Sequence, residues 1–169
     1  LPQWGISEWK GVLYPEKTKA ELFLQEYAKR MDCVEVSSSF YAEVTKDKWL
    51  KWKSCVRDTF QFLPKWPKTI THKNYLKNTT PFIKDFIDGV SVLDDNLGTT
   101  LLQLPPNFSI EYKRELFHFL ETIPQGFPLT IEFRHTSWFK ENRLYDKLEN
   151  YLIKKEVGMV ICDTPTRQD

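Results

Sequence analysis

Residues 129–134 read Leu-Thr-Ile-Glu-Phe-Arg, an alternation of apolar and polar side chains over the length of one strand. One face of such a strand carries only apolar side chains, which are Leu129, Ile131 and Phe133. The opposite face carries Thr130 and Glu132 and leads to Arg134. This stretch therefore predicts a strand that packs under helices on one side and ends in charged groups on the other.

The same alternation recurs in four more short apolar runs, at residues 33–36, 60–63, 99–104 and 159–162. In each run the second face ends, at or just beyond the carboxyl end, in a polar or charged residue: Glu35, Lys65, Gln103 and Asp163. A parallel sheet covered by helices on both faces would instead read as continuously apolar. The runs thus predict a parallel sheet with one apolar and one polar face.

Amphipathic segments separate these runs. Apolar residues repeat at intervals of three and four over residues 20–31, 49–56, 82–90, 112–123 and 144–152, the pattern of one helix face. Strand and helix alternate with a repeat of roughly 30 residues, which is typical of βαβ units. The fold class predicted from the sequence is therefore α/β with a parallel sheet.

Two parallel architectures compete, the doubly wound sheet and the closed barrel. The six glycines form neither a GxGxxG motif nor a P-loop, so the phosphate-binding turn of the doubly wound nucleotide folds is missing. A polar opening at the carboxyl ends of the strands is what a barrel provides. We therefore expect a (β/α)8 fold of the TIM-barrel type.

The length does not suit a whole barrel. Eight βα units need about 250 residues, whereas this chain has 169. No linker or low-complexity tract divides it, so we expect one domain over residues 1–169, with about six strands of the barrel present and residues 1–5 as the end of the first. An open arc leaves strand edges unpaired, and we therefore predict a partial barrel whose C-terminal units are missing.

The amino-acid composition argues against several classes of function. The 24 Lys and Arg nearly balance the 23 Asp and Glu, which argues against a general attraction to nucleic acid or acidic lipid. No apolar run approaches the ~18 residues of a membrane helix. Cys33, Cys55 and Cys162 form no CxxC pair, so zinc-ribbon and thioredoxin signatures are missing. We expect a cytoplasmic protein with reduced thiols, without membrane contact, and no feature predicts a cofactor.

Several motifs follow one another in a distinctive order along the whole chain. They are Trp4-Gly5, Trp9-Lys10-Gly11, Tyr14-Pro15, Val34-Glu35, Ser39-Phe40-Tyr41, Lys65-Trp66-Pro67, Ile70-Thr71-His72, Leu101-Leu102-Gln103-Leu104-Pro105-Pro106-Asn107-Phe108, Glu132-Phe133-Arg134-His135, Trp138-Phe139, Asp163-Thr164 and Arg167. Together they resemble the YecE-like family, also called domain of unknown function 72. The resemblance implies a TIM barrel that continues beyond the Asp163 motif for several strands, and it implies no established activity. Ser37 stands where the family often has Asn, and the family's Gly-rich opening strand is absent.

Eight polar residues are expected to surround the carboxyl ends of the strands, where barrel active sites lie. We call them the strand-end cluster: Glu35, Lys65, His72, Gln103, Glu132, Arg134, Asp163 and Arg167. One interpretation is an internal network of ion pairs, because a buried charge left unpaired costs about 3–5 kcal/mol. The other is an active site. We favour the active site, since a charge at every strand end costs stability that hydrophobic residues would not.

The residue types in the cluster suggest roles. Glu35, Glu132 and Asp163 are the candidate catalytic carboxylates, and desolvation by neighbouring Trp4, Tyr41 and Trp138 would raise the pKa of a carboxyl group. Lys65, Arg134 and Arg167 suit a clamp for a phosphate or carboxylate. Gln103, His72, Tyr41 and Trp138 complete the predicted substrate-binding set. The best-fitting function is a hydrolase, lyase or isomerase that acts on a small anionic molecule.

Three other functions stay open. Glu35, Glu132, Asp163 and His72 could ligate a divalent metal, but no HxH or HExxH spacing occurs and three cations share the opening, so no metal site is predicted. Nucleic-acid binding is suggested by lysines interleaved with tryptophans over residues 46–53. We prefer buried tryptophans beside a solvated lysine face. A nuclease-like barrel and a non-catalytic binder of small molecules remain alternatives, and the oligomeric state is not determined.

Overall fold

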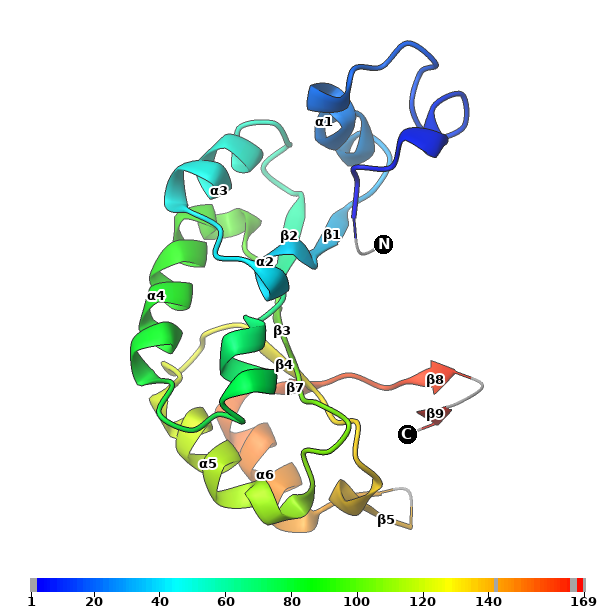
Figure 1. Cartoon of the computed structure of the whole chain (residues 1–169). Coiled ribbons are helices and arrows are strands. Elements are labelled where there is room, and N and C mark those ends of the chain that lie inside the picture. The colour runs from blue at the N-terminus through cyan, green and yellow to red at the C-terminus, as the bar shows by residue number, and fades with distance from the viewer. Residues whose placement is uncertain (1–2, 142, 165–166, 169) are drawn as a thin grey trace.

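Five short parallel strands form the inner layer of the described chain (Figure 1). The computed structural model describes residues 3–141, 143–164 and 167–168, with side chains for residues 3–141 and 143–162. The strands are β1 (Cys33–Val36), β2 (Gln61–Pro64), β3 (Thr100–Gln103), β4 (Leu129–Glu132) and β7 (Gly158–Met159). They overlap all five apolar runs, so the prediction of an α/β fold with parallel strands is confirmed.

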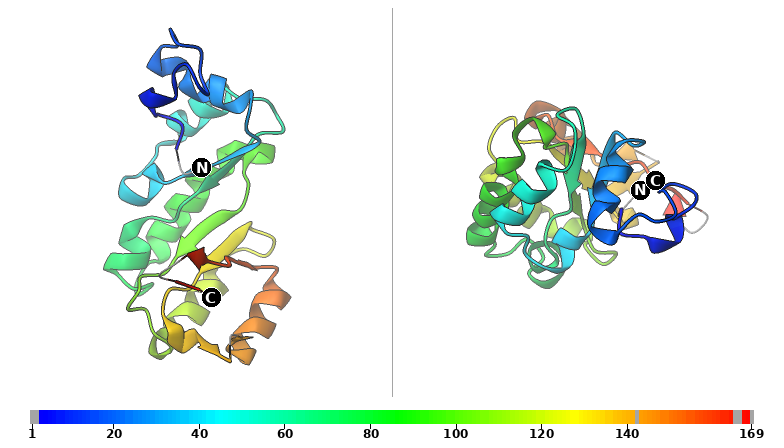
Figure 2. Two further views of the ribbon diagram at one scale, coloured as in Figure 1. Left: turned by 90° about the vertical axis from the view of Figure 1, so that its right-hand side faces the viewer. Right: turned by 90° about the horizontal axis from the view of Figure 1, so that it is seen from above.

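The strands follow one another in chain order. Val34 pairs with Phe62 between β1 and β2, and β3 pairs with β4, which pairs in turn with β7. Single bridges from Phe62 to Leu97 and from Lys65 to Leu101 link β2 to β3. The described strands thus make an open arc, and no closed barrel is found among them (Figure 2).

The described chain forms α-helices, most of which lie along the outer side of the arc, whereas the short helix Ser38–Tyr41 lies at the carboxyl end of β1 (Figure 1). They are α1 (Phe23–Ala28), α2 (Ser38–Tyr41), α3 (Lys46–Lys53), α4 (Thr80–Val90), α5 (Lys113–Thr122) and α6 (Asp146–Lys155). Short 3-10 turns occur at η1 (Ser7–Trp9), η2 (Ala20–Leu22), η4 (Ser91–Asn96), η5 (Ile110–Tyr112) and η6 (Thr136–Trp138), and a π-helical turn, η3, spans Thr69–Lys73. Two antiparallel pairs complete the chain, β5 (Phe139–Lys140) with β6 (Arg143–Leu144) and β8 (Asp163–Thr164) with β9 (Arg167–Gln168).

The expectation that residues 1–5 end a strand is wrong for Gln3–Gly5, which form no strand. Aromatic contacts hold this segment instead. The Trp4 carbonyl accepts a hydrogen bond from the Tyr14 hydroxyl at 2.5 Å, and the Trp4 ring meets the Trp52 ring edge-on at 5.0 Å. The arc therefore contains five parallel strands in its described part rather than six.

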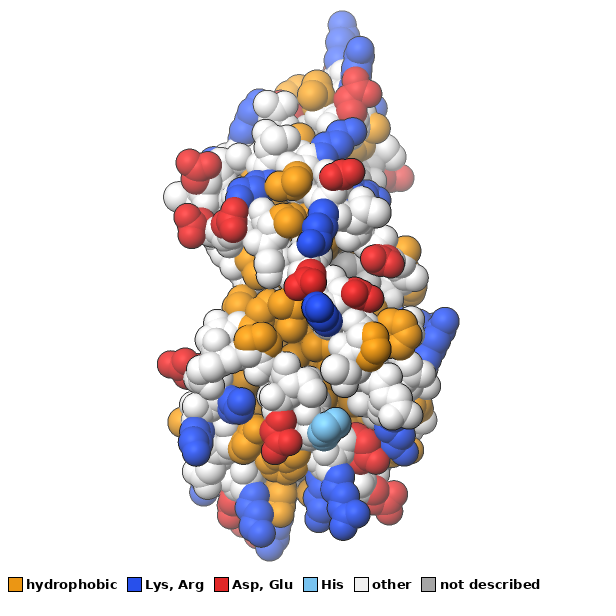
Figure 3. All heavy atoms as spheres, turned by 90° about the vertical axis from the view of Figure 1, so that its left-hand side faces the viewer, with side chains coloured by type: hydrophobic (Ala, Val, Ile, Leu, Met, Phe, Trp, Pro, Cys, Tyr) orange, Lys and Arg blue, Asp and Glu red, His pale blue; other side chains and the backbone are white. Residues whose placement is uncertain are grey.

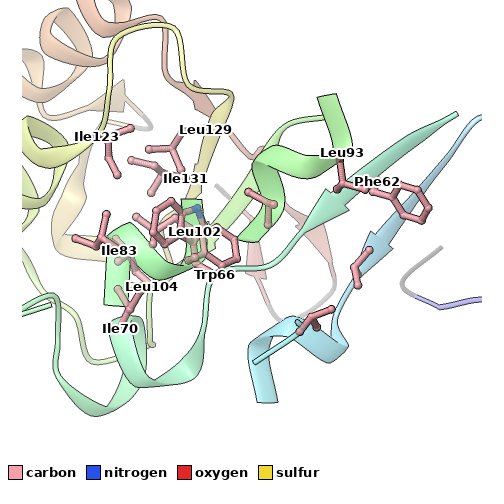
Figure 4. Close-up of a cluster of buried hydrophobic side chains, with 14 of the residues drawn as sticks. Phe62, Trp66, Ile70, Ile83, Leu93, Leu102, Leu104, Ile123, Leu129 and Ile131 are labelled. Atoms are coloured by element: carbon pink, nitrogen blue, oxygen red, sulfur yellow. The ribbon is translucent and has the colours of Figure 1, made fainter. Parts of the chain in front are cut away.

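The apolar core lies between the strands and the helices (Figure 4). The buried positions alternate along β1, β2 and β3, and Val34, Phe62, Leu102 and, in β4, Ile131 are fully covered. Trp66, also fully buried, donates its indole N–H to the Thr100 hydroxyl at 2.9 Å. Since neighbouring residues of a strand point to opposite faces, this packing turns the polar strand positions to the concave side of the arc.

The helix-covered outer face carries side chains of both charges, interspersed rather than gathered into one basic patch (Figure 3). This matches the balanced composition, 24 cationic against 23 acidic residues. In the part of the chain that the structure describes, no helix is long and apolar enough to cross a membrane.

Candidate functional site

The register of the arc brings four members of the strand-end cluster to one face at one end. Gln103 and Glu132 are paired residues at the last positions of β3 and β4. Lys65 directly follows β2, and Glu35 is the third residue of β1. Residues directly opposite in a parallel pair project to the same side, so the predicted gathering of these side chains follows from the pairing itself.

Glu132 is the buried acid of the group, with 6% of the residue exposed. The Gln103 amide donates a hydrogen bond from Nε2 to Glu132 Oε2 at 2.7 Å. A carboxylate at the edge of a core needs such a donor, because burying it unpaired would cost several kcal/mol. Gln103 therefore orients Glu132, and the ligand contact predicted for Gln103 from the sequence stays a prediction.

Glu35 is the second acid of the group, and its side chain is more exposed than that of Glu132. The Ser37 hydroxyl donates to Glu35 Oε1 at 2.8 Å, and Lys65 Nζ lies 4.0 Å from the same oxygen. Lys65 is 14% exposed at its side chain, and its ammonium group lies 5.0 Å from the centre of the Phe40 ring. The Ser39 hydroxyl bonds the carbonyls of Val36 and Lys65, both at 2.7 Å, and so holds the ends of β1 and β2 together.

His72 stands on η3, the turn that follows Lys65 along the chain. Its Nδ1 lies 2.8 Å from the Thr71 hydroxyl, and its ring meets the Phe40 ring edge-on at 5.0 Å. Burial lowers the pKa of His72, and the positive charges of Lys65, Lys68 and Arg134 lower that pKa further, against a smaller opposing effect of Glu132. The imidazole is therefore neutral near pH 7, with one nitrogen that donates and one that accepts.

Tyr41 and Trp138, the two aromatic residues predicted to bind substrate, differ in their exposure. Tyr41 is 78% exposed at the end of α2, and its ring touches only the edge of Phe40 among the described rings. Trp138 is fully buried, donates its indole N–H to the Phe108 carbonyl at 2.7 Å and stacks on the Phe108 ring. Tyr41 is thus accessible to a ligand, whereas Trp138 supports the loop after β4 from within the core.

The family model described as a protein of unknown function, DUF72, matches residues 1–169, the whole chain. The chain belongs to the DUF72 family. It is 30% identical to the Escherichia coli protein YecE over 164 residues and 28% identical to the Bacillus subtilis protein YunF over 178 residues. These matches cover 97% and 95% of this chain but only 58% and 60% of the relatives, so the DUF72 chain spans less than two thirds of their length. The resemblance to the YecE-like family is thereby confirmed.

Solved DUF72 proteins share the arrangement. A family member from Thermotoga maritima superposes with a TM-score of 0.76 at 25% identity, covering 98% of this chain and 64% of that one. A member from Enterococcus faecalis gives a TM-score of 0.74 at 22% identity, covering 98% of this chain and 60% of that one. The names of these proteins state no activity.

The last two members of the strand-end cluster fall near the C-terminus of the DUF72 chain. Asp163 lies in β8 and Arg167 in β9, but their side chains lie outside the described residues. Among the described side chains, no three His, Cys, Asp or Glu gather closely enough to hold a metal ion. The catalytic role predicted for Asp163 and the anion contact predicted for Arg167 stay predictions.

The lysines and tryptophans of α3 have different surroundings in the structure. Trp49 is buried in the core, and Lys53 pairs with Asp94 at 2.7 Å and also bonds the Val92 carbonyl. Lys48 lies over the Trp52 ring, 5.1 Å from its centre. This arrangement agrees with buried tryptophans beside a solvated face more closely than with a row of exposed stacking platforms.

Sequence reasoning missed three residues of the site. Lys68 adds a positive charge near His72, Ser37 bonds Glu35, and Phe40 is the ring that Lys65, His72 and Tyr41 share. Lys68 carried a signal, since it follows the Lys65-Trp66-Pro67 motif directly. Phe40 stood in the Ser39-Phe40-Tyr41 motif and Ser37 at a position where the family often has Asn, but neither signal indicated the contacts that these two residues make.

Proposed function

We propose that the strand-end cluster is the active site of an enzyme, a hydrolase, lyase or isomerase that acts on a small anionic molecule. The observation that carries the proposal is the buried carboxylate of Glu132, which Gln103 holds at the end of β4. The positive charges of Lys65, Lys68 and Arg134, which lower the pKa of His72, support it. An excess of positive charge around a neutral imidazole favours an anionic ligand. Perturbed titratable groups near strand ends are typical of functional sites.

Each described group has a role in this proposal. Glu132, held by Gln103, acts as the general acid or base, since a carboxyl group with a fixed orientation transfers protons efficiently. Lys65 and Arg134 bind the anion, and the guanidinium offers two parallel donors. Glu35, 4.0 Å from Lys65, is a second group that can carry a proton. Asp163 is the third catalytic carboxylate of the proposal, and Arg167 is the third cation that binds the anion.

The proposal also covers the fold of the whole protein, which we propose to be a TIM barrel. Residues 1–169 form one partial domain of a (β/α)8 barrel, and the further residues that its relatives have supply the remaining units. The support is the open parallel arc with helices on one side and the 58–60% coverage of the curated relatives. In such a barrel the carboxyl ends of the strands form the ligand-binding face. The cytoplasmic location stays a prediction from composition.

The test is the variant Glu132→Gln in a protein of the relatives' full length, assayed against phosphorylated and carboxylated small molecules. We expect turnover to fall by about 10²–10⁴-fold, the usual contribution of a general acid or base. The amide keeps the shape of the side chain, so the thermal midpoint reports whether the fold survives. Glu16→Gln, at an exposed acid of the N-terminal segment, is the matched control and keeps full activity.

Full turnover in Glu132→Gln would remove Glu132 from the reaction. Loss of turnover together with a collapsed thermal transition would assign it a structural role instead.

A further inference from the structure

A cavity of about 380 Å³ lies beside the strand-end cluster, between the N-terminal segment, the end of β1 and α3. We call it the aromatic cavity. Its principal lining residues are Trp4, Gly5, Ser37, Tyr41, Lys48 and Trp52. This volume falls in the range of small-molecule sites, which are about 300–1,000 Å³ and mainly apolar with few polar groups.

The aromatic walls are held in place from behind. The buried Tyr14 hydroxyl donates to the Trp4 carbonyl, and the Trp4 ring packs edge-on against Trp52. The Trp52 ring in turn meets Trp49, which is buried in the core, at 5.1 Å. Burial and the neighbouring Tyr27 raise the pKa of Tyr14 to about 12, so its hydroxyl stays a donor at ordinary pH. The Trp4 and Trp52 walls therefore require little reorganisation to receive a flat ligand.

The cavity is also connected to the proposed active site. Ser37 lines the cavity and donates its hydroxyl hydrogen to Glu35, the carboxylate 4.0 Å from Lys65. One end of a molecule in the cavity would thus contact Ser37, which is hydrogen-bonded to Glu35 of the strand-end cluster.

The charge in the cavity is positive. Lys48 is the charged residue in its lining, and within the described side chains Lys48 forms no ion pair. A cation that is not paired with an acid favours an anion over a second cation. Three aromatic rings favour a flat ring, through offset and edge contacts.

We propose that the aromatic cavity is the subsite for a planar aromatic ring carried by the anionic substrate. This inference rests on the proposed function, and it narrows the substrate class to aromatic phosphates or carboxylates. Trp4, Tyr41 and Trp52 bind the ring, and Lys48 adds positive charge. The anionic group reaches the cations of the strand-end cluster past Ser37.

The experiment is isothermal titration calorimetry on a protein of the relatives' full length, with phenyl phosphate compared to inorganic phosphate. Benzoate compared to acetate repeats the test for carboxylates. We expect each aromatic anion to bind at least about tenfold more tightly than its small counterpart. Tyr41→Ala, at an exposed ring, should reduce that preference to within about threefold and leave the affinity for inorganic phosphate unchanged.

Two further variants separate a ring subsite from a general loss of structure. Trp52→Leu keeps an apolar side chain against Trp49 and should also remove the preference for the aromatic anion. Lys48→Gln should weaken phenyl phosphate several-fold, whereas Lys51→Gln, at an exposed lysine of the same helix outside the cavity, should not.

The outcomes distinguish the two proposals. Equal affinity for phenyl phosphate and inorganic phosphate, or a preference that survives both Tyr41→Ala and Trp52→Leu, overturns the ring subsite and leaves the proposed function standing. If none of the four anions binds, both proposals fail.

Discussion

His72 differs from an exposed histidine because its surroundings oppose a second proton. Burial is the largest cause of its lowered pKa, and Lys65, Lys68 and Arg134 contribute through their charges. In the unfolded chain these groups are apart, and the pKa returns to the ordinary 6.5. Between the lowered pKa and 6.5, the unfolded chain binds more protons than the folded one, so stability rises with pH in that window. Above 6.5 both states are neutral, and the contribution of His72 no longer changes.

We therefore expect the free energy of unfolding to fall as the pH is lowered through 6.5, and to fall less in His72→Gln. The measurement is urea denaturation from pH 7.5 to pH 5, with the difference between variant and parent taken at each pH. His118→Gln, at an exposed residue of α5, should keep the parent's full pH dependence. An unchanged pH dependence in His72→Gln would show that neither burial nor the cations lower the pKa of this imidazole.

At the scale of the elements, one buried amide closes the turn ahead of β2. Asn96 ends η4 and is 3% exposed. Its Nδ2 donates toward three backbone carbonyls, those of Arg57 at 3.0 Å, Asp58 at 3.1 Å and Phe60 at 2.7 Å. The Arg57 carbonyl also accepts the Phe60 backbone N–H at 2.9 Å, so the side chain adds to the backbone pairing of this turn and supplies a donor to the buried Phe60 carbonyl.

Asn96→Ala should lower the free energy of unfolding by about 1–3 kcal/mol, because it removes the side-chain donor to the buried Phe60 carbonyl. Urea denaturation measures the loss. Asn150→Ala, at an exposed position of α6, is the control and should stay within about 0.5 kcal/mol of the parent. A loss below that limit for Asn96→Ala would mean that water replaces the amide.

At the scale of the whole molecule, the concave side of the arc shows what a barrel would enclose. Cys33 is exposed there, on the same strand face as Glu35. The far edge carries exposed apolar side chains as well, Met159 and Ile161, at and beyond β7. Closure by further βα units would cover these positions, because the interior of a TIM barrel is filled by side chains.

We predict that Cys33 reacts with a thiol reagent quickly in residues 1–169 alone and at least about tenfold more slowly in a protein of the relatives' full length, since local opening then limits access. Mass spectrometry of the labelled peptides measures both rates. Cys33→Ser removes the fast phase and so assigns it, because Cys55 and Cys162 are only partly exposed. Equal rates for Cys33 in both proteins would contradict closure of the barrel over this face.

Local patterns were sufficient to locate the five parallel strands and to place four of the predicted site residues on one strand face. The alternation in 129–134 and its four counterparts located all five parallel strands, because the period of a strand depends only on neighbouring residues. The same alternation placed Glu35, Lys65, Gln103 and Glu132 on one face. The motif order also identified the family, which the match over residues 1–169 confirms.

The amino-acid sequence by itself thus determined where the five parallel strands lie, which side of β1, β2, β3 and β4 is polar, and which family the chain belongs to. Only the tertiary structure decided that Gln103 bonds Glu132 and that Trp138 is buried whereas Tyr41 is exposed. It also decided that Trp4 lies outside the strands and packs on Trp52. The physical reason is distance along the chain. Periodicity reports a residue's neighbours within a turn or two, whereas these contacts join residues whose positions depend on how whole elements pack.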